Sequence, residues 1–400
     1  MPHERKRNLA SLVELFLKSS PIVGIIGHRQ SGKTTLGSHY SKDYSTFDRE
    51  ADLALCEGGP EEFIKDRPSP FMIDECQLSP RLFPALKEHV RTHKKVGQFL
   101  LSGSVRFSSR RAIRESLTGR ILLAELLPLT WSESHELPIN SLLMRLHRDG
   151  IRTLPTQFKS RLTSSDKNII KYLETGGLPG ICFSRSAAIR SSRFQTHLDT
   201  LLDRDLRLIV ETSLPKMSLL ALLGILSASQ GNSINWENMR RESGISVLTL
   251  KKLFSAFESL FILRPVSLLG KAVPDTFYFE DTGLAHYLAG SRTRALNLQS
   301  FSHFLYCNLR EVYHYRQDTQ YSVHTYRSRG GGFVPIIFNA FGSPLAILPS
   351  LDYQPSLSSI RSAESFLSKH PHGQALIVHF GSEGKGLHSK LASIPWNWLF

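Results

Sequence analysis

The sequence predicts an α/β protein, in which a parallel sheet with helices on both faces is followed by an α-helical region and a small α+β tail. Up to about residue 135, short apolar runs at 22–26, 71–73 and 98–101 alternate with amphipathic stretches such as 80–94. Strands that alternate with helices are typical of a parallel sheet buried on both faces. From about 136 to 290 the apolar spacing is helical, and after 300 aromatic, strand-like runs are broken by glycine and proline.

The size and composition indicate a folded protein without membrane spans or a disulfide scaffold. Four hundred residues, 41% of them hydrophobic and 21% charged, can form two or three domains with cores of their own. No run approaches the roughly 18 apolar residues of a membrane span, and the basic start lacks the apolar core of a secretory signal. The four cysteines form no Cys-x-x-Cys pair, which argues against a zinc site. We therefore expect a cytoplasmic protein with no membrane partner.

The chain is basic. It carries 49 Lys and Arg against 35 Asp and Glu, a formal net charge of +14. Such a surplus attracts polyanions such as nucleic acid through the release of counterions. A solvated basic surface without a specific partner has the same charge, so DNA is a candidate partner on this observation and no more.

One motif predicts nucleotide binding. Residues 27–34 read Gly-His-Arg-Gln-Ser-Gly-Lys-Thr, which satisfies G-x-x-x-x-G-K-[ST] directly after an apolar run and before an expected helix. In such a Walker A loop the backbone N–H groups face the phosphates, the lysine reaches the β- and γ-phosphates, and the hydroxyl ligates Mg²⁺. The alternative is a glycine-rich turn that binds nothing, but eight positions and both flanks agree. The sequence therefore predicts a P-loop NTPase sheet, with the binding residues Gly27, Gln30, Ser31, Gly32, Lys33, Thr34 and Thr35.

Two further strand ends carry candidate catalytic residues. The run 71–75 is an apolar strand that ends in Asp74 and Glu75, where a Walker B strand would bring Asp74 to Mg²⁺ and Glu75 to the attacking water. The alternative is a solvated helix start at Asp74. The run 98–104 ends in Ser-Gly-Ser, and Ser104 is our candidate for sensing the γ-phosphate, with a plain turn as the alternative.

With these motifs the chain resembles the bacterial and archaeal AAA+/STAND-like P-loop ATPases. The resemblance implies ATP and Mg²⁺ as ligands, a winged helix after the ATPase domain, and often a restriction-endonuclease-like tail. It covers about residues 1–290 and rests on the segments 27–36, 74–77, 101–104, 117–120, 126–129, 176–179, 203–205 and 281–284.

The same resemblance gives a role to Arg120, in the Leu-Thr-Gly-Arg segment. In such ATPases an arginine there is a candidate for reading the nucleotide state, and a guanidinium near the γ-phosphate, from the same chain or a neighbouring one, stabilises transition-state charge. Arg106 and the arginines at 110, 111 and 114 lie close by, and a structural ion pair is the alternative role for Arg120.

The segment 217–290 has the pattern of a winged helix. Helical spacing predicts helices over 217–229, 235–242 and 246–260, and strand-like residues follow over 261–279. Winged helices bind DNA, but they also serve as lids or oligomer contacts, so DNA binding and oligomer formation both stay open. The side chains compatible with phosphate contact are Thr249, Lys251, Lys252 and Ser255 on the third helix and Arg240 and Arg241 on the second.

The tail departs from the family's pattern. The resemblance implies acids of a magnesium-binding nuclease site where this chain has Phe333, Pro335 and Leu348, and a lysine where it has Ser350. We therefore expect a restriction-endonuclease-like domain without catalytic residues, which is not an active nuclease. Its aromatic and basic residues either contact nucleic acid or form a core with a solvated rim: Tyr313, Tyr315, Arg316, Tyr326, Arg327 and Arg329.

These observations predict four segments and one main function. The segments are a P-loop AAA-type ATPase domain over 1–135, a helical linker or lid region over 136–215, a winged-helix domain over 216–290 and the nuclease-like domain over 300–400. The expected function is Mg²⁺-dependent ATP hydrolysis that moves the winged-helix lid; no Asn-Lys-x-Asp guanine-reading motif follows the sensor strand. The alternative is a nucleotide-gated DNA-binding regulator with negligible turnover. The expected catalytic residues are Glu75, Ser104 and Arg120, and the expected metal ligands are Thr34 and Asp74.

Overall fold

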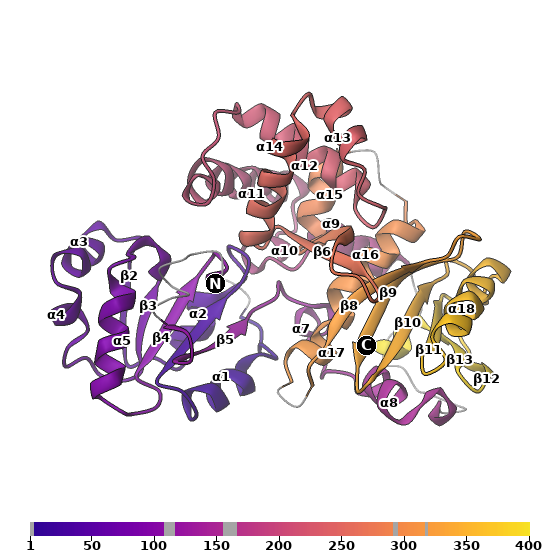
Figure 1. The fold of residues 1–400 in the computed structure, drawn as a ribbon, viewed down its shortest axis with the longest axis horizontal. Coiled ribbons are helices and arrows are strands. Elements are labelled where there is room, and N and C mark those ends of the chain that lie inside the picture. The colour runs from indigo at the N-terminus through magenta and orange to yellow at the C-terminus, as the bar shows by residue number, and fades with distance from the viewer. Residues whose placement is uncertain (1–3, 108–116, 155–165, 291–294, 317–318) are drawn as a thin grey trace.

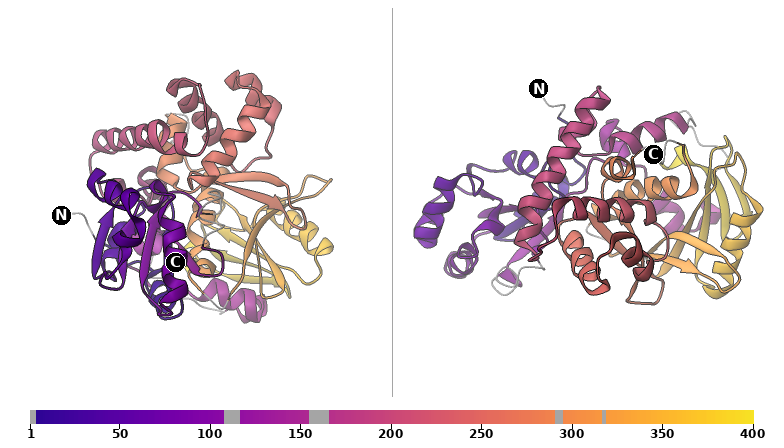
Figure 2. Two further views of the ribbon diagram at one scale, coloured as in Figure 1. Left: turned by 60° about the vertical axis from the view of Figure 1, so that its left-hand side comes forward. Right: turned by 90° about the horizontal axis from the view of Figure 1, so that it is seen from above.

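The computed structural model describes residues 4–107, 117–154, 166–290, 295–316 and 319–400. Figure 1 shows an N-terminal sheet at the left, a group of helices at the top and a C-terminal sheet at the right. Seen from above, the helices lie between the two sheets (Figure 2). None of the helices in these ranges is long and apolar enough to cross a membrane.

The first sheet is parallel, as the sequence predicts. Its strand order is β2-β3-β4-β1-β5, so the central β1 pairs with both β4 and β5. In a parallel sheet all strands end at the same edge, and the ends of β1, β3 and β4 therefore lie side by side. The strands are β1 (Ile22–Ile26), β2 (Asp43–Thr46), β3 (Phe71–Asp74), β4 (Phe99–Gly103) and β5 (Ile121–Glu125).

Both faces of this sheet are buried, which is why its strands are continuous apolar runs. Along β1, Ile22 and Ile26 pack on one face, whereas Val23 and Ile25 pack on the other. Helices α3, α4 and α5 cover the first face, and α1 and α2 cover the second. The helices are α1 (Ala10–Leu17), α2 (Lys33–Ser38), α3 (Glu50–Gly58), α4 (Pro60–Ile64), the 3₁₀ turn η1 (Cys76–Leu78) and α5 (Leu82–Thr92).

The helices of the middle region divide between two cores. Helices α8 and α9 share a core with the C-terminal sheet, whereas α10 to α15 share one with each other and with the strands β6 and β7. The three helices expected over 217–229, 235–242 and 246–260 are present as α12, α13 and α14. The elements are α7 (Trp131–Ser134), α8 (Leu142–Asp149), η3 (Ile151–Thr153), α9 (Asp166–Thr175), α10 (Pro179–Cys182), α11 (Ala187–Thr200), the π turn η4 (Leu201–Asp205), η5 (Leu206–Leu208), α12 (Lys216–Ser229), α13 (Trp236–Ser243), α14 (Val247–Ser259) and α15 (Thr282–Ala289).

The second sheet has eight strands in the order β12-β13-β11-β10-β9-β8-β6-β7. The antiparallel hairpin β6–β7 follows α14, where the sequence analysis expects strands, and β6 pairs in parallel with β8. The hairpin is therefore one end of the C-terminal sheet. The elements are β6 (Leu263–Leu268), β7 (Pro274–Phe279), α16 (Leu298–Leu309), α17 (Glu311–His314), β8 (Ser322–Arg327), β9 (Phe333–Ala340), β10 (Ser343–Pro349), α18 (Leu357–Lys369), β11 (Gln374–His379), β12 (Lys385–His388), β13 (Leu391–Pro395) and η7 (Trp396–Leu399).

Two tyrosines proposed above for nucleic-acid contact lie in the interior. Tyr313 is buried with its hydroxyl 2.9 Å from Nδ1 of His147, and the buried Tyr315 hydroxyl accepts a hydrogen bond from the backbone N–H of Leu127. Neither ring can stack on a base, because both are covered by protein. For these two residues the core alternative is correct.

Buried polar contacts join the parts of the molecule, which we call the N-terminal domain (the first sheet and its helices), the helical lobe (α10 to α15) and the C-terminal lobe (the second sheet and the helices packed on it). Gly177 donates its N–H to the carboxylate of Asp281 at 2.7 Å, and its carbonyl accepts from the N–H of Leu129 at 2.7 Å. Glu280 is buried between the guanidinium groups of Arg264 and Arg310. Gly177 and Asp281 are 104 residues apart in sequence, whereas Arg264 and Arg310 are 16 and 30 residues away from Glu280.

Candidate functional site

The site is built around the loop between β1 and α2. Gly27 has φ +149°, and a Cβ there would lie 2.3 Å from the carbonyl oxygen of Leu126, so only glycine fits. Gly32 ends the loop with φ +97°, a conformation that side chains rarely adopt. The two glycines allow the tight curl that a phosphate-binding loop requires.

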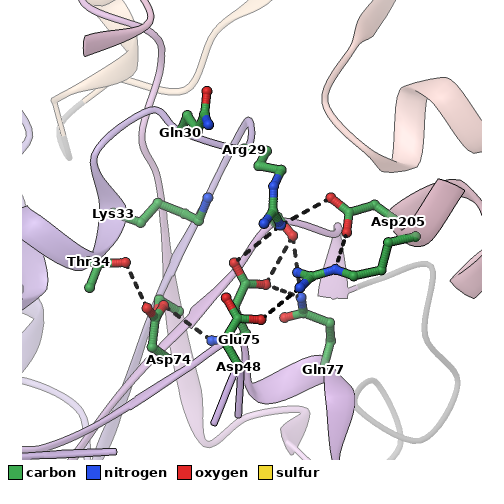
Figure 3. Close-up of polar contacts among 12 residues, drawn as sticks. Arg29, Gln30, Lys33, Thr34, Asp48, Asp74, Glu75, Gln77 and Asp205 are labelled. Carbon is green, nitrogen blue, oxygen red and sulfur yellow. Dashed lines mark hydrogen bonds and ion pairs between the residues drawn. The ribbon is translucent and has the colours of Figure 1, made fainter. Parts of the chain in front are cut away.

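Lys33 is buried at the first position of α2 and points back toward the loop (Figure 3). Its Nζ donates to the carbonyl oxygens of Gly27, at 3.1 Å, and His28, at 3.0 Å. Burial lowers the pKa of the Lys33 ammonium, because a low-dielectric surrounding disfavours charge. This cation is held at the mouth of the loop, where an anion would be its natural partner.

The carboxylate of Asp74, the predicted Walker B residue, lies beside the hydroxyl of Thr34 in the loop. Thr34 Oγ1 donates to Oδ2 of Asp74 at 2.7 Å, although the two residues are 40 positions apart (Figure 3). The same carboxylate also accepts from the hydroxyls of Ser102 and Tyr44 and from the N–H of Glu75. These donors fix its orientation at the end of β3.

Glu75 is turned to the opposite side of the strand end. It has φ 51°, in the left-handed region, and its carboxylate accepts from Ser104 Oγ at 3.1 Å and from the amide of Gln77. Gln77 also donates to Ser104 Oγ, so the three side chains form a closed, buried group. The structure therefore brings together Glu75 and the predicted sensor Ser104.

A second group of charges connects the loop to the helical lobe. Arg29, in the loop, lies with Nη1 3.3 Å from Oδ2 of Asp205 and 3.9 Å from Oε1 of Glu75 (Figure 3). Asp205 belongs to the π turn η4 and also accepts from Arg204 Nε at 3.0 Å. Arg204 in turn pairs with Asp48 at 2.8 Å. The nucleotide loop and the helical lobe are thus joined through alternating charges.

Two stacked histidines also join the loop to the helical lobe. The rings of His28, in the loop, and His197, in α11, stack with centroids 5.1 Å apart, and His197 Nδ1 lies 3.1 Å from Oε1 of Gln30. Burial lowers the pKa of His28 to about 4 and holds the pKa of His197 well below its ordinary value. Both rings are therefore neutral at physiological pH.

A cavity of about 460 Å³ opens beside the loop, on the side of α2. Gly32 and the predicted binding residue Thr35 line it, together with Tyr40 and Arg7. Arg7 is buried and donates to the carbonyl oxygens of Ser31 and Leu127, both at 2.6 Å, which fixes the N-terminal segment against the loop. The Ser31 hydroxyl is buried without a hydrogen-bond partner among the described residues.

Arg120 is not brought to the loop within its own chain. Ile121 pairs with Ile22, and Arg120 precedes it, so Arg120 lies at the edge of the sheet where the strands begin. Its carbonyl accepts from the hydroxyl of Ser20 at 3.2 Å. The loop lies at the opposite edge, so only an action across an interface between chains stays a prediction for Arg120. The arginines at 110, 111 and 114 lie outside the described residues.

The sequence analysis missed Arg29, Gln77, Ser102 and Asp205 as members of the site. Asp205 and Gln77 belong to the segments 203–205 and 74–77, which carry part of the resemblance. The resemblance assigns no role to either residue. No local signal marks Arg29, because its partner is 176 residues away.

Two family models match this chain, and the first covers the segment that holds the loop and the strand ends described above. Residues 19–135 match the family model of an AAA domain, and residues 166–295 match that of a domain of unknown function, DUF8612. The uncharacterized proteins Rv2008c of Mycobacterium tuberculosis and Mb2031c of Mycobacterium bovis are each 26% identical over 301 residues, which is 71% of this chain. The chain spans 60% of the length of these relatives.

Solved structures of low similarity were also found. The Walker-type ATPase PABY2304 of Pyrococcus abyssi is 14% identical with a TM-score of 0.42, over 70% of this chain and 94% of that one. A STAND protein with a tetratricopeptide repeat sensor, PH0952 of Pyrococcus horikoshii, is 13% identical with a TM-score of 0.27, over 75% of this chain and 44% of that one. The AAA match and the five-stranded parallel sheet, with Lys33, Thr34 and Asp74 at one edge, together support a P-loop ATPase.

Proposed function

We propose that this chain is a Mg²⁺-dependent ATPase whose nucleotide state is transmitted to the helical lobe. The observation that carries the proposal is the convergence of three strand ends. Thr34 and Asp74 share a hydrogen bond of 2.7 Å, and Glu75 and Ser104 share one of 3.1 Å, next to a lysine that faces the loop. A phosphate cradle, a metal position and a water-orienting carboxylate are thus adjacent.

The side chains present fit a magnesium ion. Mg²⁺ prefers oxygen ligands and is usually held by one or two side chains together with substrate phosphates. The Thr34 hydroxyl and the Asp74 carboxylate are such ligands and would hold it, and Ser102 and Tyr44 keep the carboxylate turned toward the loop. When bound, Mg²⁺ supplies positive charge that neutralises the β- and γ-phosphate oxygens.

Each catalytic side chain then has a task. The Lys33 ammonium would exchange the two loop carbonyls for phosphate oxygens. Glu75 would orient the attacking water and accept its proton, and Gln77 and Ser104 would hold the carboxylate in place for that transfer. Ser104, which is hydrogen-bonded to Glu75, would have the sensor role predicted above.

The coupling to the helical lobe would run through Arg29. This guanidinium contacts both the candidate base Glu75 and Asp205 of η4. A movement of Glu75 on nucleotide binding or hydrolysis would therefore alter the ion pair between Arg29 and Asp205. The helix α11 that precedes η4 packs with α12, α14 and α15 in one core. We assign the segment 216–290 as the winged-helix lid, and the motion would displace its helices α12–α14, because the hairpin β6–β7 is paired into the C-terminal sheet.

The cavity beside α2 would take the base and ribose. It adjoins Gly32 and Thr35 of the loop and helix, as the remainder of a nucleotide requires once its phosphates occupy the loop. We propose ATP, because the sequence has no guanine-reading motif.

The test is nucleotide binding and its dependence on Mg²⁺. Lys33→Ala should reduce ATP affinity by at least tenfold, and Asp74→Asn should leave ATP binding measurable but remove its dependence on Mg²⁺. Glu61→Gln, exposed on α4, is the matched control and should bind as the wild type does. Equal ATP affinity in wild type and Lys33→Ala would contradict the proposal.

A second candidate function is the nucleotide-gated DNA-binding regulator. Lys251 and Lys252 are exposed on α14, which leaves them available for phosphate contact. Under this function salt-sensitive DNA binding would occur with negligible ATP turnover. DNA affinity that is unaltered in Glu75→Gln would favour this function, and DNA-stimulated turnover would favour the ATPase.

A further inference from the structure

The C-terminal lobe has a basic groove far from the nucleotide loop in sequence. A cavity of about 720 Å³ lies between the turn that joins β8 to β9 and the helix α18. Arg327, at the end of β8, and Arg329, in the turn, line it on one side, and Arg361 and Lys369 line it from the helix. No Asp or Glu lines it in the described parts of the chain. Four cations therefore face one cavity without a carboxylate among them.

The amphipathic pattern of α18 explains why its cations face the cavity. Ala363 and Phe366 are buried against the sheet, whereas Ser358, Arg361, Ser362, Ser365 and Lys369 recur at helical spacing on the side that lines the cavity. The serine hydroxyls add neutral hydrogen-bond donors between the two cations. On this face Ser362 accepts a hydrogen bond from the N–H of Phe333 and Ser365 contacts the hydroxyl of Tyr326, whereas Arg361 and Lys369 are exposed.

Three of the four cations have no carboxylate partner. Arg327 pairs with Asp275 at 2.8 Å and lies 4.0 Å from the centroid of the Phe333 ring. Within the described residues Arg329, Arg361 and Lys369 form no ion pair, and all three are exposed. The facing turn is also bare, because Gly330 and Gly331 have open space where a side chain would project. An anion could therefore approach the cations across the turn, whose own N–H groups at Gly331 and Gly332 are donated to Ser328.

The groove continues into a second cavity, which we call the apolar arm after the apolar side chains of Phe333, Pro335 and Leu348 that line part of it. This cavity of about 390 Å³ shares Gly331, Ser358 and Ser362 with the first and is lined further on by Phe333, Pro335 and Leu348. The last three are the positions where the sequence analysis expected acids in an active nuclease. No Asp or Glu lines this second cavity either, as far as the described residues go. The groove thus lacks carboxylates that would hold a metal.

We propose that this groove binds the sugar–phosphate backbone of a single-stranded nucleic acid without cleaving it. Arg329, Arg361 and Lys369, the three cations without a carboxylate partner, neutralise successive phosphates, and the serine hydroxyls donate hydrogen bonds to phosphate oxygens. The apolar arm receives unpaired bases, which a duplex would hide in its stack. This site is independent of the proposed ATPase function.

The experiment is fluorescence anisotropy with a labelled single-stranded DNA of about 20 nucleotides, the full chain and a series of salt concentrations. Single strands give a slope of log affinity against log salt of about −0.7 for each neutralised phosphate, so contacts by the three unpaired cations predict about −2. Arg329→Glu combined with Arg361→Glu should weaken binding at least tenfold and make the slope less steep by about 1.4.

The matched control is Lys94→Glu combined with Lys95→Glu, which changes the net charge equally at two exposed positions beyond α5. It should retain most of the affinity. A strand of the same length with abasic sites should bind several-fold more weakly, and a duplex more weakly still. Thermal melting verifies that both double variants are folded.

Four results would overturn the inference. Equal weakening in the groove and control variants would reduce the binding to net charge. Unchanged binding in the groove variant would place the contact elsewhere, and equal binding of the abasic strand would remove the role of the apolar arm. Cleavage of the strand by the wild type in Mg²⁺, lost in the groove variant, would show a nuclease site instead.

Discussion

The contact between the nucleotide loop and the helical lobe can be tested by Asp205→Asn. The carboxylate is 1% exposed at its side chain and has one oxygen on Arg29, at 3.3 Å, and the other on Arg204, at 3.0 Å. An amide of the same shape offers one oxygen, so one hydrogen bond is lost and the other becomes weaker, because the guanidinium then donates to an uncharged oxygen.

The size of the effect follows from the partners that remain. A hydrogen bond to a charged group contributes about 1.5–3 kcal/mol. Arg204 keeps Asp48 at 2.8 Å and is 38% exposed at its side chain, so solvent and that second partner offset part of the loss. We therefore expect Asp205→Asn to lower the free energy of unfolding by about 2 kcal/mol. For a cooperative unit of roughly 150–250 residues this lowers the melting temperature by about 4–8 °C.

The same variant should also slow hydrolysis. Without Asp205, Glu75 becomes the main carboxylate partner of Arg29, and an ion pair that draws the candidate base toward Arg29 keeps it from the water. We expect turnover about tenfold lower with ATP affinity unchanged, measured by steady-state hydrolysis and by nucleotide titration. Asp203→Asn, exposed on the same turn and paired with Lys216, should change neither quantity. If the two variants melt and turn over alike, the proposed coupling through Arg29 is wrong.

Three further predictions concern stability. The pKa of His28 is about 6.5 in the unfolded chain and about 4 in the folded one, so the free energy of unfolding falls as pH drops through this window, by about 2 kcal/mol at pH 5. His28→Gln should reduce the pH dependence of the melting temperature, and an unchanged pH dependence would contradict this. Gly177→Ala places a Cβ 2.1 Å from a backbone carbonyl oxygen and should cost about 3 kcal/mol in denaturant unfolding, whereas Gly180→Ala meets no atom within 4 Å and should be neutral. Glu280→Gln leaves the buried Arg310 guanidinium without its anion, whereas the partly exposed Arg264 keeps Glu125, so the change should cost about 3 kcal/mol, against no measurable change for Glu364→Gln, which is exposed on α18.

The parts of the site that the sequence predicts are those encoded in contiguous residues. The Walker A loop needs a strand, two glycines, a lysine and a hydroxyl within 13 positions, and its local chemistry determines its shape. Asp74 and Glu75 follow a buried strand that can only be internal to the sheet, so their meeting with Thr34 follows from parallel pairing. The predicted helices of the middle region are likewise visible, because each has its own apolar face.

The remaining contacts depend on how the lobes pack, which no local pattern encodes. The pairing of Arg29 with Asp205 and the stacking of His28 on His197 join residues more than 160 positions apart. The junction of β6 with β8 involves only two residue pairs, too short to leave a signal in the sequence. Aromatic residues such as Tyr313 serve equally as core and as stacking surface, and only burial distinguishes the two.

The measurement that tests the ATPase claim most directly is hydrolysis by wild type and Glu75→Gln at saturating ATP and Mg²⁺, with ATP affinity measured on the same samples. The amide keeps the shape of the side chain but cannot accept the proton of the water, so turnover should fall at least a hundredfold while ATP affinity stays within about threefold. Equal turnover in the two proteins, or no turnover in the wild type at any Mg²⁺ concentration, would contradict the account.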